Sequence, residues 1–186
     1  ELAARNPGVT VLALENNRGK GAAVRCGMRQ AKGDYVMFID ADGATDIKHL
    51  DLILPKIKKG SHFIIGSRSR KDAVGAGQVR KQVFWKRWLG QLGNCLIRWS
   101  GISGIHDTQC GFKVFSRPAA LDSLLPSQTN RWAFDVEVIL LALKKGYQID
   151  IIPVRWFNSD ISRVRKFDYI YTLFEVIRIR IRIKNE

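Results

Sequence analysis

Residues 35–43 are Tyr35-Val36-Met37-Phe38-Ile39-Asp40-Ala41-Asp42-Gly43. The five leading residues predict a buried strand, and two carboxylates follow at its carboxyl end. Side chains at positions i and i+2 of an extended chain point the same way, so Asp40 and Asp42 can reach one cation. Carboxylates favour hard cations such as Mg²⁺ or Mn²⁺, and open α/β sheets bind ligands at this edge. The alternative is an ordinary Asp-Gly surface turn.

Strands and helices alternate on both sides of this stretch, which predicts an α/β fold with a mostly parallel sheet. Strands are expected at residues 9–14, 34–39, 62–66, 108–116 and 149–154. Helices are expected at residues 22–31, 47–59, 79–100 and 134–145, with Gly60 and Gly146 as stops. From Phe167 onward the pattern fits both a helix and, at residues 177–183, an alternating strand. The helical period is clearer, so a helix is favoured.

The chain is strongly basic, with a net charge of +14 over 186 residues. Residues 68–98 contribute +7 of this charge, because eight Lys or Arg side chains face a single acid, Asp72. Such a charge predicts attraction to a polyanion, an anionic membrane surface or a phosphorylated substrate. The segment 163–186 is a basic amphipathic tail that suits a membrane surface. Three widely spaced cysteines favour reduced thiols, and no apolar run is long enough to span a bilayer.

Four further loops carry polar groups next to predicted strands or helices. Residues 17–21 open a helix directly after a strand, where Arg18, Gly19, Lys20 and Gly21 can receive a phosphate. Arg68 follows the strand at 62–66 and can bind a phosphate through two parallel hydrogen bonds. The alternative is that Arg68 is an ordinary exposed arginine in a surface loop. Residues 106–113 include Asp107 and Lys113, and a lysine inside a strand suggests an anionic ligand. Residues 131–137 place Arg131 before Asp135 and Glu137 at a helix start, where one acid suits a structural role.

These blocks occur in the order of a known family. Together they resemble glycosyltransferase family 2 with the GT-A fold, and within it the enzymes that glucosylate dolichyl phosphate. The specific blocks are Asp107-Thr108-Gln109-Cys110-Gly111-Phe112-Lys113 and Arg131-Trp132-Ala133-Phe134-Asp135-Val136-Glu137. The resemblance covers nearly the whole chain and implies a three-layer sandwich in one partial catalytic domain, residues 1–186. It implies inverting transfer of glucose from UDP-glucose to dolichyl phosphate, at the cytosolic face of the endoplasmic reticulum membrane.

The resemblance also implies roles for the residues above. Asp40 and Asp42 would bind the nucleotide diphosphate through Mg²⁺ or Mn²⁺, with Asp42 as the more direct ligand. The loop from Arg18 to Gly21 would lie near the nucleotide, and Asp107 stands where related enzymes place a candidate base. A phosphate acceptor is already an anion, so it needs little deprotonation. Stabilising the leaving group matters more, and Arg68, Lys113 and Arg131 are the candidates for that.

One departure concerns the start of the chain, which opens on Glu1 at what resembles the family's third strand. We therefore expect a fragment without the amino-terminal βαβ unit that holds the base, and little activity from these 186 residues alone. The nearest rival interpretation is a dolichyl-phosphate mannosyltransferase, which would share the acidic pair. A nucleic-acid-binding module lacks its usual motifs here, so nucleic acid is not an expected partner. A membrane-surface protein with a degenerate site is the third alternative.

Overall fold

The structure is a computed structural model, and it describes residues 2–78, 93, 97–157 and 166–185. Its central sheet has four strands in the order β1-β4-β2-β5. These are β1 (Tyr35–Ile39), β4 (Phe112–Ser116), β2 (Phe63–Ser67) and β5 (Ile149–Pro153). Strand β4 is antiparallel to both of its neighbours, whereas β2 and β5 are parallel. Three of the four strands therefore point in one direction, as expected, and β4 makes the sheet mixed.

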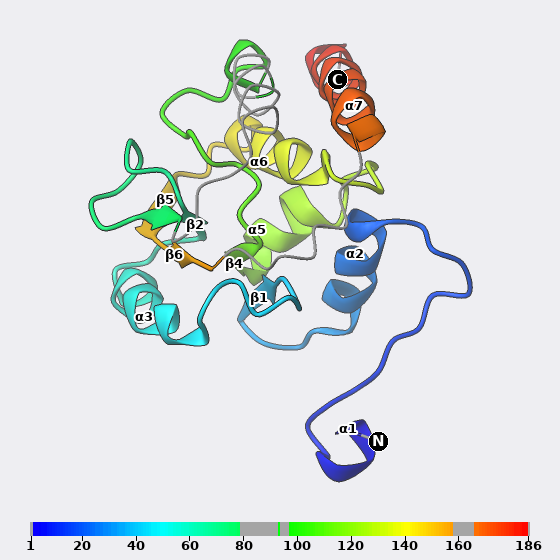
Figure 1. Cartoon of the computed structure of the whole chain (residues 1–186), viewed down its shortest axis with the longest axis vertical. Helices are drawn as coiled ribbons and strands as arrows, with labels where there is room; N and C mark the ends of the chain where they lie inside the picture. The colour runs from blue at the N-terminus through cyan, green and yellow to red at the C-terminus, as the bar shows by residue number, and fades with distance from the viewer. Residues whose placement is uncertain (1, 79–92, 94–96, 158–165, 186) are drawn as a thin grey trace.

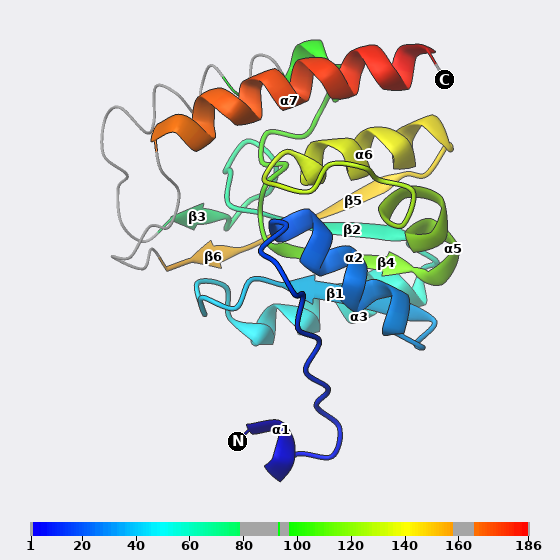
Figure 2. The same ribbon diagram turned by 90° about the vertical axis from the view of Figure 1, so that its right-hand side faces the viewer.

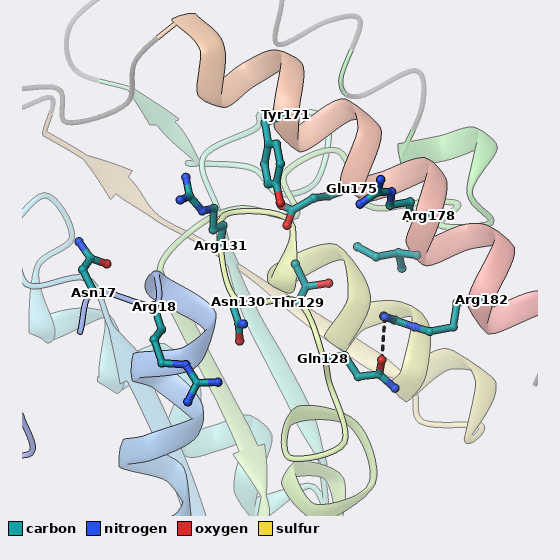
Figure 3. Close-up of a pocket in the computed structure, with 11 residues that line it drawn as sticks. Asn17, Arg18, Gln128, Thr129, Asn130, Arg131, Tyr171, Glu175, Arg178 and Arg182 are labelled. Carbon is teal, nitrogen blue, oxygen red and sulfur yellow. Dashed lines mark hydrogen bonds between the residues drawn. The ribbon is translucent and has the colours of Figure 1, made fainter. Parts of the chain in front are cut away.

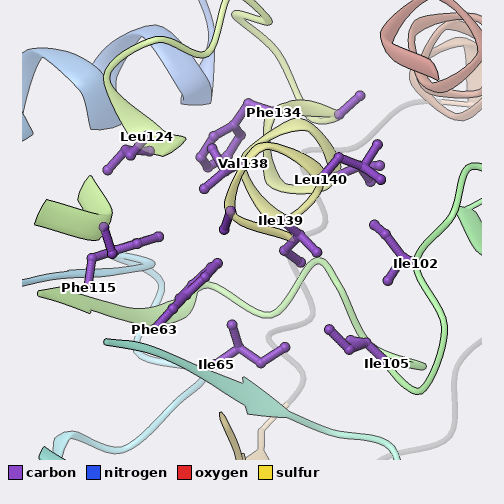
Figure 4. Close-up of a cluster of buried hydrophobic side chains, with 14 of the residues drawn as sticks. Phe63, Ile65, Ile102, Ile105, Phe115, Leu124, Phe134, Val138, Ile139 and Leu140 are labelled. Carbon is purple, nitrogen blue, oxygen red and sulfur yellow. The ribbon is translucent and has the colours of Figure 1, made fainter. Parts of the chain in front are cut away.

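Helices cover both faces of this sheet, which gives the expected three layers (Figure 1). One face packs against α2 (Lys20–Gln30) and α6 (Phe134–Lys144), with α7 (Lys166–Asn185) outside α6 (Figure 2). The core on this side joins Phe63, Phe115 and Phe134, all with no exposed surface (Figure 4). The opposite face is covered by α3 (Leu50–Lys58), which follows the turn η1 (Ile47–His49) and buries Ile53.

The remaining elements are short. Strands β3 (Gly77–Gln78) and β6 (Arg155–Trp156) form a separate parallel pair, which the sequence did not indicate. A helical turn α5 (Arg117–Ala119) continues into η2 (Ala120–Leu124), and α1 (Leu2–Arg5) stands near the amino end. No helix among the described residues has both the length and the apolar character needed to cross a bilayer.

Most expected elements are confirmed, including the helix in the tail. Helix α3 is followed by Gly60 at φ +85° and α6 by Gly146 at φ +82°, a backbone conformation that glycine adopts without strain. The alternating residues 177–183 lie within α7, where Val176 and Ile179 are buried in the first core. Packing of that helical face decides the ambiguity in the sequence pattern.

Two expectations about strands are wrong. Residues 9–14 form no strand, and Val9 and Val11 are 50% and 72% exposed. The segment extends away from the sheet, and a strand needs a neighbour for its backbone hydrogen bonds (Figures 1 and 2). Residues 108–111 are also irregular, so that strand begins only at Phe112. The helix expected at 79–100 falls mostly outside the described residues, and residues 97–99 are helical.

Candidate functional site

The direction of β4 assembles the candidate site. Because β4 is antiparallel to β1 and β2, the loop before it meets the carboxyl ends of those strands. The backbone N–H of Asp40 donates to the carbonyl oxygen of Gly111 at 2.9 Å. A Cβ atom added at Gly111 would lie 1.9 Å from Oδ2 of Asp40, so only glycine lets this carboxylate sit here. Loops that are distant in sequence thus meet at one edge of the sheet.

A series of charged side chains in contact with one another extends from this edge into the core. Lys20 Nζ lies 2.8 Å from Asp40 Oδ1 and 3.9 Å from Asp135 Oδ2. Lys113 Nζ lies 2.6 Å from Asp135 Oδ1 and donates to the carbonyl oxygen of Cys110. Burial alone would lower the pKa of Lys20, but Asp135 and Asp40 outweigh it and raise that pKa. Lys20 therefore stays cationic beside Asp40.

Lys113 and Asp135 form the buried end of this series. Their side chains are only 1% and 2% exposed. An unpaired charge at this depth would be very costly, and here each group is the oppositely charged partner of the other. A catalytic role for Lys113 stays a prediction. Its ammonium group contacts Asp135 and the carbonyl oxygen of Cys110, and the ion pair assigns Asp135 a structural role that the sequence left open.

A second ion pair joins Arg68 and Asp107. Arg68 Nε donates to Asp107 Oδ2 at 2.7 Å, and a terminal nitrogen donates to Oδ1 at 2.8 Å. The backbone N–H of Arg68 also donates to Oδ2, and the guanidinium lies 5.2 Å from the ring centroid of Trp156. Burial would raise the pKa of Asp107, but Arg68 outweighs it and lowers that pKa. A carboxylate held in this way is a weak base, so the geometry favours Asp107 as the residue that orients Arg68.

Asp72 is a site residue that the sequence reasoning did not select. Its side chain has no exposed surface, and its oxygens accept from Ser67 Oγ and from the backbone N–H groups of His106 and Asp107. Asp72 therefore fixes the loop that carries Asp107. The sequence offered one indication of this role, because Asp72 is the single acidic residue in the segment 68–98, which also contains eight Lys or Arg residues.

The loop before α2 is held close to the loop before α6. Gly19 has φ +97°, and a Cβ atom there would lie 2.6 Å from the carbonyl oxygen of Asn130. A Cβ atom on Gly21 would lie 2.5 Å from the carbonyl oxygen of Thr129. Both glycines are thus explained by the close packing of the start of α2 against the 128–131 loop, and their expected contact with a nucleotide stays a prediction.

Two charged residues, Arg25 and Glu137, hold the loop 128–131 in place through hydrogen bonds. Arg25 donates to the carbonyl oxygen of Thr129 at 2.7 Å and to the side chain of Asn130. Glu137 accepts from the backbone N–H groups of Gln128 and Thr129 at 2.8 and 2.7 Å. Glu137 also pairs with Arg182 of α7. The role of Glu137, like that of Asp135, is therefore to hold the architecture of the site.

Asp42 differs from the acids described so far because it is exposed. Its Oδ1 accepts from the backbone N–H of Ala44 at 3.0 Å, which is a side-chain turn that leaves further lone pairs for a ligand. Asp40 is partly exposed, with 38% of its side chain accessible. Among the described residues no group of three or more His, Cys, Asp or Glu side chains could hold a metal ion. The candidate metal ligands are therefore the two carboxylates of Asp40 and Asp42, whose oxygens suit Mg²⁺ or Mn²⁺.

Arg131 and Arg18 lie apart from the Arg68–Asp107 pair. Both line a pocket between the 128–131 loop and α7 (Figure 3). The Arg131 guanidinium lies 5.5 Å from the ring centroid of Tyr171 in α7. The structure therefore brings Lys20, Asp40, Arg68, Asp107 and Lys113 to one edge of the sheet, and it places Arg131 in the pocket under α7.

Cys110 lies within this edge but is not a nucleophile. It is 1% exposed, and burial, with Asp107 adding to it, raises its pKa to about 11. A thiol with that pKa stays protonated at neutral pH. Its position behind Gly66 is a packing contact, since a Cβ atom on Gly66 would lie 3.3 Å from its sulfur.

Comparison with known proteins identifies relatives of this chain. The chain is 37% identical over 94% of its length to the dolichyl-phosphate beta-glucosyltransferase of Dictyostelium discoideum, and 36% identical over 83% to that of Saccharomyces cerevisiae. It is 31% identical over 86% of its length to the enzyme of Homo sapiens. These alignments cover 54%, 49% and 50% of the three relatives. The chain therefore spans about half the length of the curated relatives it matches.

Solved structures share the fold at much lower identity. The glucosyl-3-phosphoglycerate synthase of Mycobacterium tuberculosis in complex with UDP is similar with a TM-score of 0.60 and 14% identity, over 97% of this chain and 58% of that one. The same enzyme in complex with Mn²⁺, UDP-glucose and phosphoglyceric acid gives 0.59 and 12%, with the same coverage. The family model described as glycosyl transferase family 2 matches residues 1–121. The chain therefore belongs to glycosyl transferase family 2.

Proposed function

We propose that the intact protein, including any residues beyond these 186, transfers glucose from UDP-glucose to dolichyl phosphate with inversion. The observation that carries the proposal is that Asp40, Lys20 and the Arg68–Asp107 pair meet at one sheet edge, where the exposed Asp42 follows Asp40 by two residues. The relatives named dolichyl-phosphate beta-glucosyltransferase, which match over most of the chain, support the choice of sugar and acceptor.

The chemistry of this reaction fits the groups present. The bond between the anomeric carbon and the diphosphate oxygen breaks, and a phosphate oxygen of the acceptor forms a new bond to that carbon. UDP leaves with the bonding electrons, so negative charge grows on its diphosphate. Lys20, held cationic beside Asp40, and Arg68, oriented by Asp107, are placed to receive that charge. The acceptor is already an anion, so the weak basicity of Asp107 is no obstacle.

A divalent metal fits the accessible acidic pair. Asp42 and Asp40 would hold Mg²⁺ or Mn²⁺ through carboxylate oxygens, and the ion would supply neutralisation of the diphosphate. The proposal draws support from the Mn²⁺ that accompanies UDP-glucose in the synthase with the same fold. Since Lys20 already pairs with one oxygen of Asp40, Asp42 is the freer ligand. Asp40 would then connect the ion to the buried charges behind it.

The outer face of α7 supports a membrane location for the reaction. Ile170, Phe174 and Ile181 are exposed by 49%, 63% and 55%, and they share one helix face at intervals of four and seven residues. Basic residues lie between them along the same helix, and such a helix suits the surface of an anionic bilayer. We extend the proposal to the cytosolic face of the endoplasmic reticulum membrane, where a lipid-linked acceptor would be met.

The decisive experiment is a donor competition with the intact protein in membranes. Radiolabelled UDP-glucose and GDP-mannose are offered with dolichyl phosphate and Mg²⁺ or Mn²⁺, and the lipid product is identified after mild acid hydrolysis. Glucosyl product alone supports the proposal. Mannosyl product would instead assign the rival dolichyl-phosphate mannosyltransferase activity. Absence of both products, with the protein shown to be folded, would remove the proposed function.

A further inference from the structure

Helix α7 and the loop 128–131 line an open basic pocket of about 410 Å³ (Figure 3). Four arginines line it, namely Arg18, Arg131, Arg178 and Arg182, against one carboxylate, Glu175. Neither the acidic pair nor the Arg68–Asp107 pair lines this pocket. The roles expected for Arg18 and Arg131 from the sequence stay predictions, and the transfer reaction as proposed above uses Lys20 and Arg68 instead.

The arginines of the pocket are not equally engaged. Arg182 pairs with the buried Glu137 and donates to Gln128 Oε1 at 3.1 Å, so its charge is already used. Arg131 lies over the Tyr171 ring and shows no ion pair within the described part of the chain. Arg178 and Arg18 line the same space and, across the ranges that the structure describes, have no hydrogen bond or ion pair to a protein group. Three guanidinium groups are thus left to attract an anion.

Glu175 adds a second, independent observation. Its Oε2 is buried and has no hydrogen-bond partner among the described residues, although the side chain is bonded to the backbone of Ala133. Figure 3 shows this side chain between Arg131 and Arg178. Burial raises the pKa of Glu175, and Glu137 adds to this, while Arg131 and Arg178 oppose it. A buried oxygen without a partner is costly, and a protonated carboxyl can donate that missing hydrogen bond to a ligand oxygen.

We propose that the pocket under α7 is a phosphate-binding site, in which Arg131 and Arg178 bind the phosphate oxygens and Glu175 lies against them. Guanidinium groups bind phosphate through paired hydrogen bonds, and the pocket volume exceeds that of one phosphate group. The phosphate could belong to a lipid headgroup or to a free phosphate compound, since both present the same group. This site does not rest on the proposed transfer, because binding without turnover tests it.

The test measures binding of two probes to the intact protein. One probe is pyrophosphate, followed by calorimetry. The other is vesicles of phosphatidylcholine with phosphatidic acid, followed by co-sedimentation against vesicles of phosphatidylcholine alone. Arg178→Gln is expected to weaken binding about tenfold, because it removes a charge-assisted hydrogen bond. Lys184→Gln is the matched control on the same helix, outside the pocket, and should change binding by less than about twofold.

A second variant separates binding from misfolding. Glu175→Gln keeps the shape and donates a hydrogen bond at every pH, whereas the wild-type carboxyl donates only in its protonated form, so phosphate should bind more tightly, a gain that a damaged fold cannot produce. Binding of pyrophosphate with this pattern assigns a free phosphate compound, and binding of vesicles alone assigns a lipid headgroup. The proposal is overturned if neither probe binds, or if Arg178→Gln and Lys184→Gln weaken binding equally. Equal losses would indicate only a diffuse basic surface.

Discussion

The acids at the sheet edge form two groups that differ in how fully they are paired. Asp107 and Asp135 are buried, and each has a cation within 2.7 Å of its oxygens. Asp40 and Asp42 lie only two residues apart and reach solvent, and among the described residues the hydrogen bond of the Asp42 side chain is with the backbone N–H of Ala44. The same side-chain chemistry thus serves two purposes. Buried carboxylates position cations, whereas accessible carboxylates keep oxygens for a ligand.

The reason lies in the cost of burying charge. A carboxylate away from water stays ionised only when a partner compensates it, and a compensated group has little left to offer a substrate. Asp40 stands between the two groups, because Lys20 pairs with one of its oxygens while 38% of its side chain is exposed. This comparison predicts that changes in the buried group act mainly on stability, and that changes in the accessible group act mainly on binding.

The largest effect on stability is expected from Asp135→Asn. It leaves the Lys113 ammonium, 1% exposed, without its carboxylate, and breaking such a buried pair costs about 3–5 kcal/mol. Urea unfolding of the intact protein measures this. The control is Asp150→Asn, whose ion pair with Lys56 has the same 2.6 Å separation but side chains that are 31% and 37% exposed, so it should cost no more than about 1 kcal/mol.

The double variant Lys113→Met with Asp135→Leu sharpens the same point. Because both charges are removed together, no uncompensated ion remains, and much of the lost stability should return. Equal destabilisation by Asp135→Asn and Asp150→Asn would show that burial does not distinguish the two groups of acids.

Arg68→Gln is expected to have the next largest effect, a loss of about 2 kcal/mol at neutral pH from the hydrogen bonds to a charged partner. The pKa of Asp107 is lowered in the folded protein, so its pairing stabilises the fold above the ordinary pKa of 3.8. That contribution is lost as the pH falls through the lowered pKa. The stability gap between wild type and variant should therefore shrink on acidification. A gap that stays constant from pH 7 to pH 2 contradicts this pairing.

Gly111→Ala should lower the stability of the fold less than the two variants above, and its main effect should be a loss of activity. The new Cβ atom would lie 1.9 Å from Asp40 Oδ2, so the carboxylate must move from its place beside Lys20. A displacement of this size at a reacting site can lower activity by about a hundredfold. Gly27→Ala, where no heavy atom lies within 4 Å of the added Cβ, is the control and should leave glucosyl transfer unchanged. Full activity in Gly111→Ala would show that the position of Asp40 is unimportant.

Much of the fold follows from local sequence patterns. The positions of α2, α3 and α6 are indicated by apolar spacing and by the glycines that follow two of them. The direction of β4 is not, because pairing between strands depends on contacts distant in sequence. Residues 9–14 have the apolar character of a strand, but no strand within the described part of the chain pairs with them. Periodicity identifies a segment that can form a strand, and only the partner makes it one.

The candidate site shows the same limit. Asp40, Asp42, Arg68 and Lys20 could be selected from their places after strands or before a helix. Their partners could not, since the pairing of Lys113 with Asp135 crosses 22 residues and that of Arg68 with Asp107 crosses 39. Sequence position indicates which groups are polar at the edge of a sheet. Only the fold shows which of them are already neutralised.

The central claim is that the accessible acids hold the metal and the nucleotide. The most direct measurement is UDP binding to the intact protein by calorimetry, with and without Mn²⁺, for wild type and Asp42→Asn. Asparagine can still accept from the Ala44 N–H, so unfolding stability should change by less than about 0.5 kcal/mol. We predict that Mn²⁺ strengthens UDP binding in wild type and has no such effect in the variant. Equal Mn²⁺-dependent binding in both proteins would contradict the account.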